Sequence, residues 1–180
     1  MHQRLTEIVH YLNETRSALF DAFAAIPESQ REERPADGSW TPAEVIDHLA
    51  IVEGGIARLV AKRAASAAAK GIGADPETTS LLTSLDRFGV ARPTRKLDAP
   101  EMVRPRAGVS AAAATDAIRR SRQTLQEAIQ SAEGVDLSQL KAQHASLGEI
   151  DLYQWLLFVA QHESRHTLQL NAARLALAGR

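Results

Sequence analysis

Residues 151–177 predict one long amphipathic helix, and its apolar face carries two histidines. At about 100° per residue, the apolar face follows a regular helical period. The residues on this face are Trp155, Val159, His162, His166, Gln169, Ala173 and Leu177. His162 and His166 are four residues apart, so their rings stand one above the other and can reach a single point. Two imidazoles within an apolar face either hydrogen-bond in the core or hold a ligand.

Three earlier stretches show the same helical period of apolar residues. They span about 4–26, 42–69 and 110–131. The second helix has complete starting signals, with Thr41 as N-cap, proline at the first helical position and Glu44 able to close a capping box. The last helix begins in the same way at Asp151, with Gln154 three residues later. No stretch shows the alternation typical of a strand, so the sequence predicts an all-α fold.

The segment 71–109, which links the second and third helices, is rich in glycine and proline. It is long enough to return along a helix of about 40 Å, and we expect a crossover that contains a turn or two of helix. The whole chain, residues 1–180, is therefore predicted to be a single four-helix-bundle domain with a long crossover between helices 2 and 3. Basic residues cluster in this crossover, and Asp98 and Glu101 balance them, which favours a solvated surface. The cluster contains Arg92, Arg95, Lys96, Arg104 and Arg106.

The composition excludes several functional classes. A net charge of −1 over 180 residues gives no electrostatic basis for binding nucleic acid or an anionic membrane. The chain has no cysteine, which excludes disulfides and thiolate metal sites. No apolar run is long enough to span a bilayer, and the N-terminus lacks the layout of a signal peptide. We expect a cytoplasmic protein with neither membrane nor nucleic-acid partners.

A third histidine, His48, is predicted to face inward from the second helix, at the flank of its buried stripe. Three neutral imidazoles around an open position are the ligand set of a catalytic zinc site, whereas structural zinc sites are closed by four ligands. Helix bundles commonly build metal sites between facing helices. The three histidines therefore favour a divalent metal site; the other interpretation is that they only hydrogen-bond within the core.

Residues 162–166, H-E-S-R-H, also match the short zinc-protease pattern H-E-x-x-H, in which the glutamate is the general base. The longer versions of that pattern require glycine at 169 and histidine at 172, where this chain has glutamine and alanine. A protease is therefore disfavoured. Glu163 lies about 100° from His162 and is expected to be solvated or to support a ligand, with a general-base role as a further possibility.

Two other residues near the histidines are candidates for the site. Gln169, one turn beyond His166, is the candidate for lining the site or orienting the bound nucleophile. Arg165 could meet an anionic substrate, although an arginine at such a position is more often a surface residue.

Three segments of the chain resemble the DinB-like (YfiT-like) superfamily of metalloenzymes. They are W-T-P-A-E-V-I-D-H-L-A at 40–50, A-P-E-M-V-R-P at 99–105 and H-A-S-L-G-E-I-D-L-Y-Q-W-L-L-F-V-A-Q-H-E-S-R-H-T-L-Q-L at 144–170. The resemblance covers nearly the whole chain and implies a four-helix bundle, often dimeric, so a homodimer is possible. It also implies a zinc or nickel site formed by His48, His162 and His166. His144 matches a histidine of the family that is not expected to be a ligand.

The resemblance also implies a class of chemistry, because relatives include hydrolases and transferases that use a small thiol such as mycothiol or bacillithiol. An open coordination position lowers the pKa of a bound water or thiol and creates a nucleophile at neutral pH. Without a cysteine, this chain would need a low-molecular-weight thiol as cosubstrate. We predict a metal-dependent hydrolase or thiol-dependent transferase with a small-molecule substrate. The alternative is a non-enzymatic binding or dimerisation module that the metal stabilises.

Overall fold

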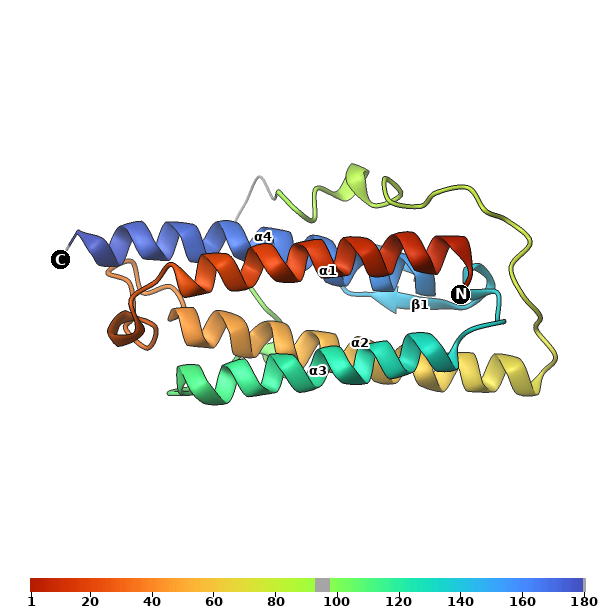
Figure 1. Ribbon diagram of the computed structural model, residues 1–180, viewed down its shortest axis with the longest axis horizontal. Coiled ribbons are helices and arrows are strands. Elements are labelled where there is room, and N and C mark those ends of the chain that lie inside the picture. The colour runs from red at the N-terminus through yellow and green to blue at the C-terminus, as the bar shows by residue number, and fades with distance from the viewer. Residues whose placement is uncertain (93–97, 180) are drawn as a thin grey trace.

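Four long helices form a bundle in the computed structural model, which describes residues 1–92 and 98–179 (Figure 1). The helices are α1 (Gln3–Ala24), α2 (Pro42–Ala69), α3 (Ala111–Ser131) and α4 (Leu152–Ala178). Helices α1 and α4 run in one direction, and α2 and α3 run in the other. Helix α2 packs against α3 and α4, while α1 packs against α4. The predicted four-helix bundle is confirmed. In the described part of the chain, no helix is long and apolar enough to cross a membrane.

Capping boxes determine where α2 and α4 begin. The Thr41 hydroxyl accepts a hydrogen bond from the backbone N–H of Glu44, whose carboxylate accepts one from the backbone N–H of Thr41. Asp151 and Gln154 form the same reciprocal pair at the beginning of α4. Both boxes satisfy backbone donors that a helix leaves unpaired at its N-terminus. The two helices that carry the candidate histidines therefore begin where the sequence predicts.

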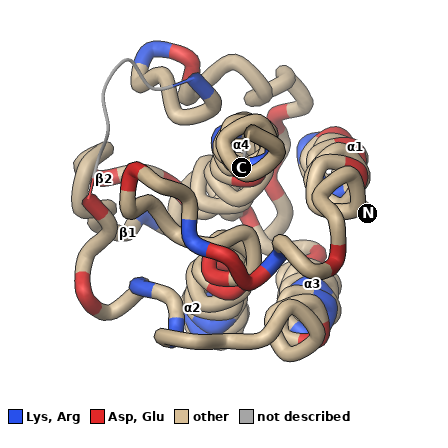
Figure 2. Tube along the Cα trace, turned by 90° about the vertical axis from the view of Figure 1, so that its left-hand side faces the viewer, with Lys and Arg blue, Asp and Glu red and all other residues tan. Residues whose placement is uncertain are grey.

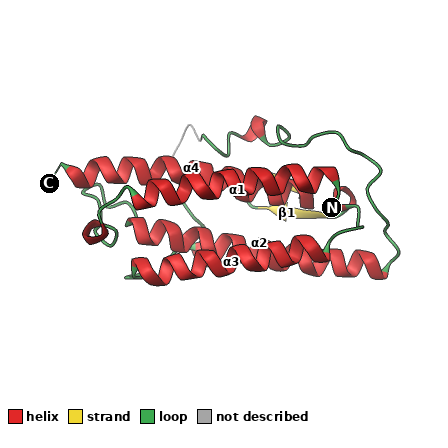
Figure 3. Cartoon of the chain, in the orientation of Figure 1, coloured by secondary structure: helices red, strands yellow, loops and turns green. Residues whose placement is uncertain are grey.

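The connection between α2 and α3 returns along the bundle and makes these two helices parallel (Figure 3). It contains two short 3₁₀ turns, Asp86–Phe88 and Glu101–Val103, as expected for a crossover with a turn or two of helix. Arg95 and Lys96 of the predicted basic cluster lie outside the described residues. The other members of that cluster, Arg92, Arg104 and Arg106, are exposed.

The prediction that the chain contains no strand is wrong for the connection between α3 and α4. Strands β1 (Lys141–His144) and β2 (Gly148–Asp151) form an antiparallel hairpin. His144 Nδ1 accepts hydrogen bonds from two backbone N–H groups of the turn, and Gly148 adopts a φ of +78°. Strands of four residues are too short to show a clear alternation of apolar and polar side chains. The hairpin lies beside α2 and α4, on the opposite side of the bundle from α1 and α3 (Figure 2).

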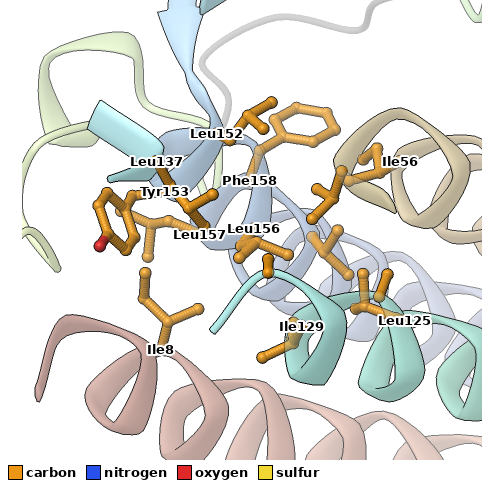
Figure 4. Close-up of a cluster of buried hydrophobic side chains, with 14 of the residues drawn as sticks. Ile8, Ile56, Leu125, Ile129, Leu137, Leu152, Tyr153, Leu156, Leu157 and Phe158 are labelled. Atoms are coloured by element: carbon orange, nitrogen blue, oxygen red, sulfur yellow. The ribbon is translucent and has the colours of Figure 1, made fainter. Parts of the chain in front are cut away.

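Two clusters of buried apolar side chains form the core. The larger cluster joins all four helices and lies around the first half of α4 (Figure 4). Its members include Ile8, Ile56, Leu125, Leu156 and Leu157. The second cluster lies towards the other end of the bundle and includes Leu19, Ile46, Ile118 and Leu170. In every helix, at least one buried polar or charged side chain lies between the two clusters.

These intervening residues form a buried ion network that links all four helices. Arg16 of α1, Glu53 of α2, Arg122 of α3 and Glu163 of α4 are each at most 9% exposed. Arg16 donates from Nε to Glu163 and from Nη2 to Glu53, both at 2.8 Å. Arg122 donates to the same two carboxylates, to Glu53 at 2.6 Å and to Glu163 at 2.8 Å. Each arginine thus bridges both glutamates.

Further hydrogen bonds complete this network. Both arginines also donate from Nη1 to a backbone carbonyl of a neighbouring helix, each at 2.9 Å. The hydroxyls of Thr15 and Ser121 donate to the carboxylates of Glu163 and Glu53. Burial lowers the pKa of Arg16, but the two carboxylates outweigh it and raise that pKa above its ordinary value. The network has no net charge and many hydrogen bonds, which are the conditions under which buried charges are tolerated.

We predict that Arg16→Met lowers the free energy of unfolding by about 3–5 kcal/mol, because it leaves two buried carboxylates with fewer partners. Urea denaturation followed by circular dichroism measures this change. Lys141→Ala is the control, since Lys141 lies 3.9 Å from Glu149 and both side chains are at least 60% exposed. Breaking such an exposed pair is expected to cost less than about 1 kcal/mol. Equal costs for the two variants would contradict the structural role of the network.

Candidate metal centre

The structure brings together the three histidines that the sequence singles out. His48 comes from α2, and His162 and His166 come from successive turns of α4. Nε2 of His162 lies 3.4 Å from Nε2 of His48 and 3.0 Å from Nε2 of His166. The candidate ligand atoms of all three residues lie within 4.8 Å of one another. Each side chain is buried, with at most 9% of its residue exposed.

Hydrogen bonds at Nδ1 orient two of these rings. His48 donates from Nδ1 to the backbone carbonyl of Val103 at 2.6 Å, and His166 donates from Nδ1 to Oε1 of Gln169 at 2.7 Å. A neutral imidazole with its proton on Nδ1 has a free lone pair on Nε2. Both lone pairs are thereby available at the point where the rings meet. Gln169, a candidate for lining the site, contacts the site through this hydrogen bond to His166.

Aromatic rings pack around the histidines. The ring of Trp40 lies 4.8 Å from that of His48 and 6.5 Å from that of His166, measured between centroids. Phe158 stacks on His162 with a centroid distance of 5.0 Å and an interplanar angle of 19°. These contacts restrict rotation of the imidazoles and remove them from water. Trp40 precedes the N-cap of α2, so the same tryptophan lies at the helix start and beside the site.

Burial lowers the pKa of all three imidazoles. It lowers the pKa of His166 to about 3 and that of His162 well below its ordinary value. It also lowers the pKa of His48, although the Val103 carbonyl acts in the opposite direction. The three rings are therefore neutral at pH 7. Neutral imidazole is the form that binds a metal ion.

The arrangement fits a divalent cation. With zinc–nitrogen bonds of about 2.0–2.1 Å, two ligands of a tetrahedral site lie roughly 3.3 Å apart. The separations of 3.0 and 3.4 Å between Nε2 atoms are close to that value. Nitrogen lone pairs turned towards one another at this distance repel unless a proton or a cation lies between them. Three protein ligands would also leave one position of a tetrahedral site open.

The crossover holds His48 in place through the last residue of its second 3₁₀ turn and through a residue that follows this turn. The Val103 carbonyl accepts from His48, and three residues later Arg106 binds Asp47. The backbone N–H of Arg106 donates to Asp47 at 2.8 Å and its Nη2 donates at 2.6 Å. Sequence reasoning missed this support, because a backbone carbonyl has no side-chain signature. Only the motif at 99–105 marked the segment.

Glu163 does not lie at the surface, and the expectation of a solvated side chain is wrong. It is 1% exposed, and its carboxylate accepts hydrogen bonds from Thr15, Arg16 and Arg122 in the buried network. The rotation of about 100° from His162 carries it towards α1 and α3, not towards water. With both oxygens engaged there, Glu163 is not directed at the histidines. The geometry gives no support to a general-base role.

The histidines line an open cleft of about 1490 Å³. Its walls come from α2 and α4, the segment 35–40 that precedes α2, the crossover and the β-hairpin. Much of the lining is apolar and aromatic, including Ile56, Leu59, Phe88, Trp155 and Phe158. Arg165 and His144 also line the cleft. His144 packs against Trp155 and Phe158 and lies outside the group of three histidines.

A sequence model of the DinB superfamily matches residues 11–170. The chain belongs to the DinB superfamily. The DinB-like resemblance of the three motifs is thereby confirmed. The fold of this DinB-superfamily chain is similar to that of TT2238, a four-helix bundle protein known from a crystal structure, with a TM-score of 0.59 and 21% identity. The similarity covers 93% of this chain and 98% of TT2238, and it concerns the fold alone. Among curated proteins, none matches the chain.

We predict that the metal-free protein loses stability as the pH falls below about 6.5. The unfolded chain then takes up protons on its histidines, while His166, whose pKa is about 3, stays neutral in the folded protein. Stability conferred by a neutral imidazole is full above the unfolded pKa and falls by roughly 1.4 kcal/mol per pH unit below it. Urea denaturation with a chelator at several pH values between about 7 and 5 measures the slope.

His166→Gln is the control for this pH dependence. It removes one buried imidazole, so the stability of the variant should fall less steeply with decreasing pH. Identical slopes for the variant and the wild type would contradict the assignment of the lowered pKa.

Proposed function

We propose that this protein is a metal-dependent enzyme that acts on a small molecule, with one zinc or nickel ion held by His48, His162 and His166. The convergence of three Nε2 atoms on the wall of an open cleft is the observation that supports it. Structural zinc sites are closed by four protein ligands, whereas catalytic sites keep a position open. The described residues offer no fourth ligand in this group.

A divalent cation in this position would act as a Lewis acid and lower the pKa of a water or a small thiol. The protein's own residues hold and orient the imidazole rings of the site. Gln169 holds the ring of His166, the Val103 carbonyl holds that of His48, and Trp40 limits access of water. The chain has no cysteine, so a thiol must come from a cosubstrate. The proposed reaction is therefore hydrolysis or transfer to a low-molecular-weight thiol.

We predict about one zinc or nickel ion per chain in tag-free protein, measured by elemental analysis. His48→Ala and His162→Ala each remove one of three ligands and should lose the metal. Gln169→Leu should retain the fold but bind the metal about 10–100-fold more weakly, because His166 is no longer held.

His10→Ala is the matched control for these variants, since His10 is 77% exposed on α1 and should not affect the metal. Wild-type protein that contains no metal, even after incubation with zinc, would overturn the proposal. Metal retained in both ligand variants would locate the site elsewhere.

The alternative function is a binding or dimerisation module in which a metal ion holds α2 and α4 together. The buried ion network and the two apolar clusters argue against such dependence, because they hold the helices without a metal. We predict that a chelator leaves the helical signal intact and lowers the Tm by about 5–10 °C, the effect of losing a saturating ligand. Circular dichroism measures both quantities. Collapse of the helical signal on metal removal would favour the structural module.

A further inference from the structure

Arg165 is a half-buried arginine of α4 that lines the same cleft as the three histidines. Among the residues that the structure describes, its guanidinium has no hydrogen-bond or ion-pair partner. Three more deeply buried arginines behave differently: Arg4, Arg16 and Arg122 each pair with a carboxylate. A guanidinium that has lost part of its hydration without gaining a partner is energetically unfavourable. A ligand with an acidic group would supply the missing partner.

The position of Arg165 places such a partner next to the candidate metal centre. Arg165 follows His162 by three residues, and residues three apart on a helix are neighbours, with roughly 5–6 Å between their Cβ atoms. It also directly precedes His166 in the sequence. A planar guanidinium can form two parallel hydrogen bonds to one carboxylate or sulfonate, which fixes orientation as well as distance. An acidic group held there brings the adjacent atoms of the ligand to the histidines.

The remaining charges of the cleft do not favour anions by themselves. Arg87, Arg92 and Arg104 line it, but so do Asp37, Asp86 and Asp98, so these charges of the two signs balance. Arg92 and Arg104 are also exposed at its rim. Recognition of an anion inside the cleft therefore depends on Arg165. The neighbouring lining is apolar and aromatic, with Trp155, Phe158, Ile56 and Leu59.

We propose that Arg165 is a specificity-determining residue that binds the acidic group of the substrate, and that the substrate is a small organic acid with an apolar body. This inference rests on the proposed function only for the claim that the ligand of the cleft is a substrate. The binding of the acid itself requires no metal. It deepens the proposed function by naming the class of molecule that the cleft accepts.

The test compares two probes of the same shape, 3-phenylpropane-1-sulfonate and the uncharged methyl 3-phenylpropyl sulfone. Sulfonates are poor ligands for zinc and nickel, so a preference for the sulfonate reports the protein and not a metal. Isothermal titration calorimetry on the full chain as purified, with its metal content measured, gives both affinities. The wild type should bind the sulfonate about tenfold more tightly, as expected for hydrogen bonds to a charged group.

Variants of two arginines show whether the preference for the sulfonate depends on Arg165. In Arg165→Gln the two probes should bind with about equal affinity. Arg165→Lys should retain part of the preference, because lysine keeps the positive charge but lacks the planar guanidinium that forms two parallel hydrogen bonds. Arg104→Gln removes the same charge from the rim of the same cleft and should change the ratio less than about twofold. Circular dichroism verifies that each variant is folded. If Arg165→Gln does not fold, Arg165→Lys still tests the inference.

Several outcomes would overturn the inference. These are equal affinities in the wild type, no saturable binding of the sulfonate, an unchanged preference in both Arg165 variants, or an equal loss in Arg104→Gln. The result is separable from the metal proposal. A preference that depends on Arg165 in a protein without metal would support this inference while the metal proposal fails. A metal-loaded protein without the preference would support the metal proposal and overturn this inference.

Discussion

The ion network of Arg16, Glu53, Arg122 and Glu163 is the interaction on which the rest of the bundle depends. Each arginine bridges both carboxylates, and the four residues come from four different helices. Sliding or rotating one helix would break several charge-assisted hydrogen bonds and leave charges buried without partners, which is strongly unfavourable. Apolar side chains of similar size tolerate repacking far better. The network therefore specifies the register and rotation that the two apolar clusters leave open.

This rotation also determines the direction in which the histidines point. Glu163 directly follows His162, so fixing its side chain towards α1 and α3 turns His162 and His166 towards α2. On α2, Glu53 and His48 are five residues apart, which places them about 140° apart around the helix axis. One faces the network and the other faces the cleft. The structural charges and the candidate ligands thus face different sides of the same helices without sharing a residue.

The sequence predicts features that depend on local spacing. The capping pairs Thr41–Glu44 and Asp151–Gln154 place the helix starts, and the spacing of His162 and His166 places both imidazoles on one face. The surroundings of Glu163 could not be predicted in this way, because its angle on the helix does not reveal that α1 covers that side. The Val103 carbonyl was missed for a related reason. It lies 55 residues from His48 and belongs to a loop whose path depends on tertiary packing.

The helices and the connecting segments make different contributions to the cleft. Helices α2 and α4 carry the histidines and Arg165, and the network holds these helices together, which a binding site of defined geometry requires. The crossover and the β-hairpin, in contrast, contribute Phe88, Met102 and His144 to the lining of the cleft. Connecting segments accept substitution and insertion more readily than packed helices. The bundle therefore fixes the position of the three histidines, and the connections shape the cleft that leads to them.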